Sequence, residues 1–322
     1  MPKVSVILNT YNSAKFILET VSTVQNQTLS DFELLIIDDG STDDTLEIVS
    51  SIKDSRIQIY SYDNAGIAKS RNRGLSHSSA EFIAFLDHDD LWHECKLENQ
   101  WRLLIEVPDA CLACSWIEMI SESGNFIRYC STVSSNNNVH KKILTKNFLQ
   151  TASNPLMRKE HILRVGGFDE DIYGADDWDL FIRLISQAPI VISPRYEVYY
   201  RIVKGSGSAN VGKIEQGCLR VIDKAFDKSP VELYPIKQEA LGVIYQFLCY
   251  RLIEEVPNSL SGIKAFKYLA KSYQYRSSLW SSWAIAKVFS EAALISGLPP
   301  QLSRYVLTTA KSLMPRKSGF KG

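Results

Sequence analysis

Short apolar runs alternate with segments of helical periodicity through the first third of the chain. The apolar runs cover residues 4–8, 32–37, 57–60 and 82–86. The runs at 4–8, 32–37 and 82–86 predict buried strands, because a strand covered on both faces is apolar at nearly every position, and residues 57–60 predict a further strand. Helical segments and short connections between these strands predict an α/β fold with a central, mostly parallel sheet.

Three of these predicted strands end in polar clusters, at residues 9–12, 38–41 and 87–90. Ligands bind beyond the carboxyl ends of strands in open α/β sheets, so the clusters predict one site at one edge. The third cluster, Asp-His-Asp-Asp, indicates a metal, because a divalent cation removes the repulsion between adjacent carboxylates. Oxygen ligands suit Mg²⁺ or Mn²⁺. The alternative is that these acids cap a helix over residues 92–106.

A second acidic cluster begins a helix predicted over residues 176–185. Asp176, Asp177 and Asp179 fall within its first turn, where the helix dipole stabilises negative charge. Helix capping accounts for one or two of these acids, so three of them favour a functional role. Between residues 111 and 164 the pattern is less regular, and we expect strands at 111–120 and 124–129.

From about residue 215 onward the pattern becomes helical. The predicted helices cover residues 216–226, 236–254, 260–275, 281–295 and 302–313. We therefore expect two parts, an α/β domain over residues 1–214 and an all-α appendage over residues 215–322. Aromatic residues in the appendage are expected to pack between its helices.

Composition is typical of a soluble globular protein, with 45% hydrophobic and 22% charged residues among 322. The formal net charge is zero, which gives no reason to expect nucleic acid as a partner. The charge is uneven, however: from Gly262 onward the chain has ten Lys and Arg residues and one acidic residue, Glu291. This basic region predicts peripheral contact with an anionic membrane surface, with a solvated helix face as the alternative.

The six cysteines are scattered and no secretory signal precedes them, so we expect reduced thiols and a cytoplasmic protein. Cys111 and Cys114 form a single C-x-x-C pair without a second pair, which argues against a zinc or redox site. No apolar stretch reaches transmembrane length. Peripheral attachment at the inner face of the cell membrane stays compatible with these observations.

Several ordered motifs resemble those of the family 2 glycosyltransferases. They lie at residues 4–12, 37–43, 72–74 and 85–90, followed by 166–169 with 176–180, and the resemblance covers roughly residues 3–208. It implies the GT-A fold, an α/β sandwich that binds a nucleotide sugar and carries a DxD metal motif. It further implies inverting transfer to a glycan or lipid-linked acceptor, with UDP as the expected nucleotide.

The resemblance implies a role for each matched residue on the nucleotide side. Thr10, Tyr11 and Asn12 would lie beside the base, and Asp39 would accept a hydrogen bond from its ring N–H. Arg71 would reach the base or the diphosphate, with an exposed helix arginine as the alternative.

The metal side of the resemblance involves the third polar cluster. Asp89 would ligate Mn²⁺ or Mg²⁺ with help from Asp87, which would also contact the ribose. The metal would neutralise charge on the leaving diphosphate. Asp90 would help to bind the metal or would only orient its neighbours, and His88 would be a spacer.

On the acceptor side, Asp177 aligns with the general base that takes the proton of the attacking hydroxyl. Asp176 precedes it where the family usually has Glu, and this shorter acid could change which acceptor is held. Trp178 would provide a sugar-stacking face, with a core tryptophan as the alternative. The family often has a His shortly after a Tyr-Arg pair. This chain has the pair at residues 200–201 but no His after it, so Arg201 or Lys204 would hold the diphosphate instead.

Two other functions compete with this interpretation. Nucleotidyltransferases use similar sheets but carry a Gly-rich, cationic loop after the first strand, and residues 9–12 contain neither Gly nor a cation. A catalytically degenerate nucleotide-sugar-binding module would not need the acids at Asp39, Asp87, Asp89 and Asp177.

Overall fold

The structure is a computed structural model that describes residues 1–130, 138–203, 210–227, 231–254 and 259–297. Lys204 and the helix predicted over 302–313 lie outside these residues. The chain divides into two compact units, Met1–Lys204 with Asp223–Asp227, and Gly205–Ile222 with Lys228–Gly322. The main segment of the first unit ends upstream of the boundary at residue 214 that the helical pattern suggested.

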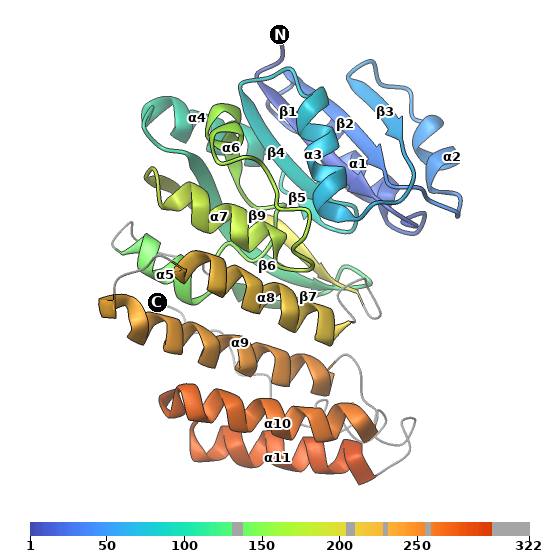
Figure 1. The fold of residues 1–322 in the computed structure, drawn as a ribbon. Coiled ribbons are helices and arrows are strands. Elements are labelled where there is room, and N and C mark those ends of the chain that lie inside the picture. Colours follow the sequence, from blue (N-terminus) through green and yellow to red (C-terminus); the bar gives the residue numbers. More distant parts are fainter. Residues whose placement is uncertain (131–137, 204–209, 228–230, 255–258, 298–322) are drawn as a thin grey trace. The chain divides into compact units, whose positions relative to one another are not determined.

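A nine-stranded mixed sheet forms the centre of the first unit (Figure 1). The strands are β1 Val4–Thr10, β2 Phe32–Asp38, β3 Ile57–Ser61, β4 Phe82–Asp87, β5 Leu91–Trp92, β6 Leu112–Ser121, β7 Phe126–Cys130, β8 Leu156–Arg158 and β9 Ile190–Ile202. Their order is β3-β2-β1-β4-β8-β6-β9-β5, with β7 beside β6. The strands from β1 to β4 are mutually parallel, as the sequence predicts, whereas β8 runs antiparallel to β4 and β6.

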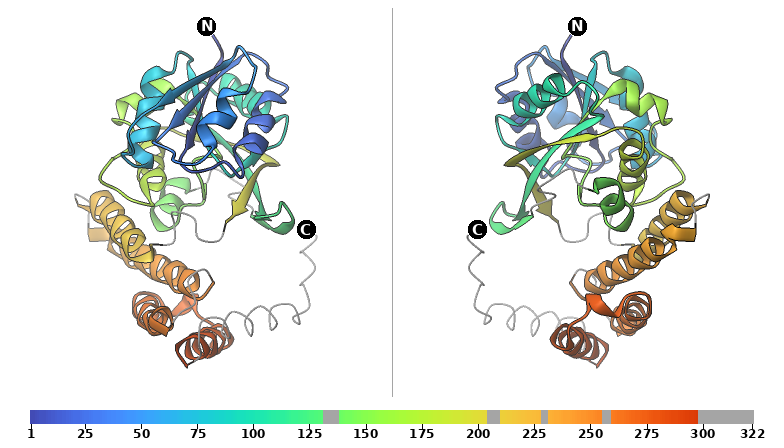
Figure 2. Two further views of the ribbon diagram at one scale, coloured as in Figure 1. Left: turned by 90° about the vertical axis from the view of Figure 1, so that its right-hand side faces the viewer. Right: turned by 90° about the vertical axis from the view of Figure 1, so that its left-hand side faces the viewer.

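Helices cover both faces of this sheet (Figure 2). Those of the first unit are α1 Ile17–Gln25, α2 Thr45–Ser50, α3 Ile67–His77, α4 Lys96–Glu106, α5 Val139–Thr145, α6 Lys159–Arg164 and α7 Asp176–Ile185. Val6 and Leu8 share a buried cluster with residues of α1 and α4. The intervening Ile7 points to the other face, where it lies against Gly74 of α3. This alternation explains why β1 is buried along its whole length.

The helices of the second unit begin with α8 Val211–Phe226, whose last residues belong to the first unit. They continue with η2 Val231–Leu233, α9 Tyr234–Glu254, α10 Ser259–Tyr275, η3 Ser277–Leu279 and α11 Ser282–Gly297. Tyr245 of α9 contacts Tyr268 and Tyr275 of α10, with ring centroids 5.5 and 5.9 Å away. These aromatic residues therefore pack between helices, as expected from the sequence.

The predicted start of the helix over residues 92–106 is wrong. Residue 92 does not begin a helix, because Leu91–Trp92 form the short strand β5, paired antiparallel with β9. The indole nitrogen of Trp92 donates to the Ser153 carbonyl at 2.8 Å, which holds this strand in place. At the end of β1, the side-chain oxygen of Asn12 accepts from the backbone N–H of Thr42 at 2.8 Å.

A lysine is buried under the sheet at the start of α4. Lys96 is fully buried, and its ammonium lies 3.9 Å from the centroid of the Trp92 ring. Among the described residues, this ammonium has no hydrogen-bond partner. Burial lowers the pKa of Lys96 to about 7, although the charge of Glu197 opposes this shift. A charged ammonium at this position therefore destabilises the fold.

Lys96→Met is expected to raise the free energy of unfolding by about 2–4 kcal/mol at pH 6. The unfolded chain binds the Lys96 proton up to about pH 10.4, whereas the folded chain releases it near pH 7. The loss of stability caused by Lys96 is therefore largest below pH 7 and decreases as the pH rises toward 10. The increase in the free energy of unfolding on substitution by methionine decreases over the same range. Urea unfolding at several pH values measures this, with exposed Lys69→Met as the control. Equal stability of parent and Lys96→Met at pH 6 would contradict the claim that the charged Lys96 destabilises the fold.

Candidate functional site

Strand β4 ends at the predicted acidic cluster, which leads into β5. Asp90 is fully buried; it accepts from the backbone N–H of Arg201 at 3.0 Å and from the Thr151 hydroxyl at 3.2 Å. Burial and the charges of Asp89 and Asp87 raise the pKa of Asp90 well above its usual value. The hydrogen bond from Arg201 to Asp90 therefore connects the segment after β4 with β9. Because the cluster is followed by a strand, the helix-cap alternative is excluded.

Arg71 of α3 joins the end of β4 to the start of α7. Its Nη2 donates to Oδ1 of Asp87 and its Nη1 to Oδ2 of Asp176, both at 2.6 Å. Only 4% of Arg71 is exposed, so the exposed-arginine alternative is wrong. Burial acts to lower the pKa of Arg71, but the two carboxylates raise it above its usual value. One buried cation therefore brings together acids from both predicted clusters.

Asp177 lies next to this bridge in the first turn of α7. It is half-buried, and its two oxygens accept from the backbone N–H of Trp178 at 2.6 Å and the side-chain amide of Asn147 at 3.3 Å. Burial and the charge of Asp176 raise the pKa of Asp177 to about 7, against the opposing charge of Arg71. A carboxyl with this pKa can exchange a proton near neutral pH, as a general base requires.

Asp89, the expected metal ligand, lies between β4 and β5 in the same polar cluster as Asp87. Burial raises its pKa, and the charge of Asp87 adds to this, while His88 and Arg201 oppose it. Among the described residues, no three His, Cys, Asp or Glu side chains form a complete metal cage. Mg²⁺ is commonly held by one or two carboxylates plus substrate phosphates, and Asp87 with Asp89 fits that arrangement.

Asp39 follows β2 and binds the backbone just before α3. Its two oxygens accept from the backbone N–H groups of Ala65 and Gly66 at 3.0 and 2.9 Å, and Arg73 pairs with it at 3.0 Å. Oδ1 accepts from both Ala65 and Arg73, whereas Oδ2 accepts only from Gly66, so Oδ2 can still accept from a ligand. Its backbone N–H donates to the Thr10 carbonyl at 2.9 Å, which links the ends of β1 and β2.

The three residues expected beside the base lie at this same edge of the sheet. Thr10 is buried, with its hydroxyl bonded to that of Ser13. Tyr11 is 47% exposed, which leaves its ring available to a ligand. Asn12 has a φ of 49°, a left-handed conformation that asparagine tolerates better than most residues.

Arg201 and Trp178 are more enclosed than their expected roles suggest. The buried guanidinium of Arg201 donates to the Glu19 carboxylate at 2.7 Å and to the Asp89 carbonyl at 2.8 Å. Trp178 is 5% exposed, and its indole nitrogen donates to the Ile143 carbonyl at 2.7 Å. In this structure both side chains form hydrogen bonds within the protein that position the segments around the site.

The structure places at the site one loop that the sequence did not single out. The loop at residues 147–154 supplies Asn147, and also Thr151, whose hydroxyl bonds Asp87 and Asp90 at 3.2 Å each. Asn9 of β1 donates to the Ser70 hydroxyl at 2.7 Å, but its side-chain oxygen is buried without a partner among the described residues. The Nε of Arg71 is also buried without a hydrogen-bond partner among these residues. A ligand or water could form hydrogen bonds with both atoms.

Curated relatives of this chain include bacterial glycosyltransferases. WfaP of Escherichia coli, named a UDP-Glc:alpha-D-GlcNAc-diphosphoundecaprenol beta-1,3-glucosyltransferase, is 30% identical over 226 residues, covering 65% of this chain and 81% of WfaP. An uncharacterized glycosyltransferase of Rickettsia bellii is 34% identical over 186 residues, which is 58% of this chain and 26% of that protein. Matches to the first three relatives span 26–31% of their length.

Solved structures show the same fold. S. aureus TarS 1-349 in complex with UDP-GlcNAc has a TM-score of 0.57 at 19% identity, covering 91% of this chain and 90% of that one. Mannosyltransferase PcManGT from Pyrobaculum calidifontis, in complex with GDP-Man and Mn²⁺, has a TM-score of 0.58 at 20% identity, covering 98% and 88%. The predicted GT-A fold is confirmed. The sequence model described as "Glycosyltransferase like family 2" matches residues 4–239, and the chain therefore belongs to this family.

Proposed function

We propose that this chain is an inverting glycosyltransferase. It moves a sugar from a nucleoside-diphosphate donor, with UDP as the expected nucleotide, to a glycan or lipid-linked acceptor. The observation that carries this proposal is the Arg71 bridge, which places the β4 acid Asp87 and the α7 acid Asp176 in one site beside Asp177. The nucleotide sugars bound in TarS and PcManGT and the acceptor named for WfaP support it.

Asp177 acts as the general base in a single displacement. It takes the proton of the acceptor hydroxyl while the hydroxyl oxygen attacks C1 of the donor sugar. The bond from C1 to the nucleoside diphosphate breaks on the opposite side, which inverts the configuration at C1. Asn147 orients the Asp177 carboxylate, and Asp176, held by Arg71, keeps its pKa near neutral.

Asp89, with Asp87, would hold Mn²⁺ or Mg²⁺. When bound, the metal supplies positive charge that stabilises the leaving diphosphate. The Mn²⁺ in the PcManGT complex supports this assignment. Around the donor, Thr10, Tyr11, Asn12 and Asp39 would contact the base.

We also propose peripheral contact with the inner face of the cell membrane, which suits a lipid-linked acceptor. In the part of the chain that the structure describes, no helix is both long and apolar enough to span a bilayer. The basic residues after Gly262 would instead be attracted to anionic lipids, at about 1 kcal/mol for each one near the surface.

A donor panel tests the proposed reaction. UDP-, GDP- and dTDP-sugars are incubated with the full chain and Mn²⁺, and release of the nucleoside diphosphate is measured together with the anomer of the first-formed sugar product. We expect release that stops on chelation, with inverted configuration at C1. Asp89→Ala is expected to lower the rate at least about 100-fold, because it removes a metal ligand.

The matched control is Asp31→Ala, an exposed aspartate just before β2, at the end of that strand remote from Asp39. It is expected to keep the parental rate. Pyrophosphate release from nucleoside triphosphates would indicate a nucleotidyltransferase instead. Tight UDP binding without turnover on any donor and acceptor would indicate a degenerate binding module.

A further inference from the structure

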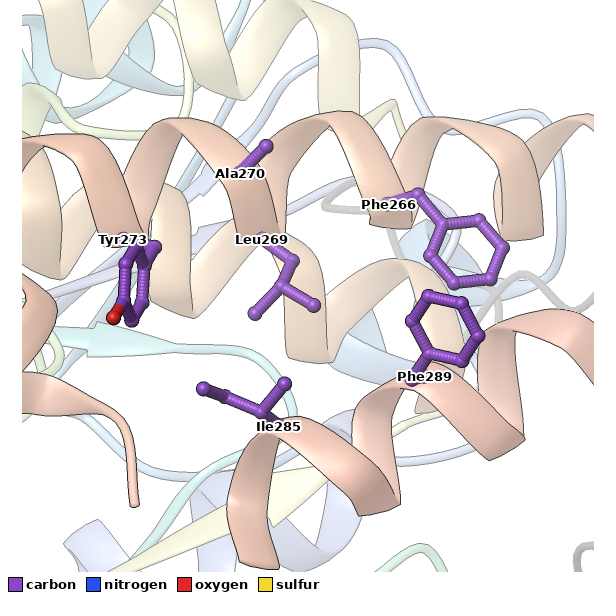
Figure 3. A pocket seen from close by; sticks show the side chains of 6 residues that line it. All are labelled: Phe266, Leu269, Ala270, Tyr273, Ile285 and Phe289. Atoms are coloured by element: carbon purple, nitrogen blue, oxygen red, sulfur yellow. The ribbon is translucent and has the colours of Figure 1, made fainter. Parts of the chain in front are cut away.

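The second unit carries an apolar groove between α10 and α11 (Figure 3). Its volume is about 490 Å³, and its lining consists of Phe266, Leu269, Ala270, Tyr273, Ile285 and Phe289. The rings of Phe266 and Phe289 face each other at one end, with centroids 4.8 Å apart. Tyr273 and Phe289 are 50% and 58% exposed, so the groove opens to solvent.

The apolar surface continues along α10 beyond the groove. Ile263 and Leu260 are 60% and 77% exposed. Ile263 lies on the same helix face as Phe266 and Ala270, because residues three, four and seven apart line one side of a helix. Soluble proteins rarely leave contiguous apolar patches of this kind without a functional partner. We call the groove and these two flanking residues the α10–α11 face.

The segment that forms this face is basic in composition. Residues 259–297 contain five Lys or Arg residues, and Glu291 is their single acid. Lys271 pairs with Glu215 and Arg276 pairs with Glu239, whereas the exposed Lys267 lies one turn from Ile263 on α10. Residues 298–322 add five more basic residues and no acid. A partner that covers the α10–α11 face would meet apolar side chains at its centre and Lys267 beside them, which favours an apolar surface that carries anionic groups.

We propose that the α10–α11 face inserts into an anionic lipid bilayer, with acyl chains entering the groove and headgroups meeting Lys267 beside it. Helices with apolar aromatic faces and lysines beside them bind membranes in this way, through buried apolar area together with attraction to anionic lipids. A second copy of the chain would bring like charges face to face. The chain's own residues 298–322 would add positive charge to a basic surface, whereas anionic lipid neutralises it.

This inference rests on the membrane contact in the proposed function and names the surface that makes it. It also changes the expected physical character of that contact. An attraction through lysines alone disappears when salt screens the charges, whereas insertion of phenylalanine side chains persists.

Co-sedimentation of the full chain with vesicles tests the proposal. The vesicles contain equal parts phosphatidylcholine and phosphatidylglycerol, or phosphatidylcholine alone. We expect the parent to prefer the anionic vesicles, and the double variant Phe266→Gln/Phe289→Gln to bind them at least about tenfold more weakly, since burial of one Phe is worth about 1.5–3 kcal/mol. Lys267→Glu is expected to weaken binding mainly at low salt.

The matched control is Phe126→Gln/Tyr129→Gln, which removes two exposed rings from β7 in the first unit. It is expected to bind vesicles like the parent, and thermal unfolding verifies that both double variants are folded. Unchanged binding by Phe266→Gln/Phe289→Gln would overturn the proposal. So would a parent dimer that this variant converts to monomer without loss of vesicle binding. Because no sugar donor is present, failure of the proposed transfer reaction would leave this result standing.

Discussion

Asp177→Asn is expected to lower the rate of sugar transfer by about a thousandfold or more, while the donor still binds with nearly parental affinity. A positioned general base contributes about 10²–10⁴-fold, and an amide of the same size cannot take the proton of the acceptor hydroxyl. The side chain of asparagine can still accept from the Trp178 N–H, so the start of α7 should keep its shape. Saturating kinetics measure the rate, and calorimetric titration with UDP measures donor binding.

Asp171→Asn makes the same chemical change at an exposed carboxyl six residues upstream. It is expected to transfer sugar at the parental rate and serves as the control. Parental activity of Asp177→Asn would show that another group accepts the proton. A loss of UDP binding equal to the loss of rate would instead place Asp177 on the donor side.

Arg71→Met is expected to lower the free energy of unfolding by about 3–5 kcal/mol at pH 7 and to abolish most activity. It leaves the carboxylates of Asp87 and Asp176 without the cation that both contact at 2.6 Å, and Asp176 is 3% exposed. Removing one partner of a buried ion pair typically costs this much. The loss should shrink as the pH falls, because burial already raises the pKa of Asp176 and its protonation removes a charge that the variant leaves unpaired.

Two further variants distinguish loss of the Arg71 ion pairs from a nonspecific destabilisation of α3. Arg71→Lys keeps the charge but cannot reach two carboxylates with a planar fork, so its stability should be intermediate. Adding Asp176→Asn to Arg71→Met should restore part of the lost stability, because it removes one unpaired charge. Urea unfolding measures all four proteins. An Arg71→Met protein as stable as the parent would show that the bridge contributes nothing.

Much of the fold was predictable because burial on both faces makes a parallel strand apolar throughout. Strands β1, β2 and β4 are buried at nearly every position, and the sequence predicted all three. The strand β5 was missed because two residues are too short to show a period. Its position depends on pairing with β9, more than a hundred residues later.

The site was predictable where motifs lie at strand ends, and less so where side chains meet across the fold. The contact between Arg71 and Asp176 joins residues 105 positions apart, which no local pattern reports. Asn147 and Thr151 lie in a polar loop without periodicity, so their position near Asp177 and Asp87 could not be read from spacing. The enclosure of Trp178 likewise depends on α5, which packs against α7.

The dependence of kcat/KM on pH tests the central claim most directly, namely that Asp177 is a general base with a pKa of about 7. Only the deprotonated carboxylate can accept a proton, so activity should fall about tenfold per pH unit below that value and level off above it. Asp176→Asn should move the midpoint to lower pH, because it removes a neighbouring charge that raises the pKa of Asp177. A rate that stays level from about pH 5 to about pH 8 would contradict the account.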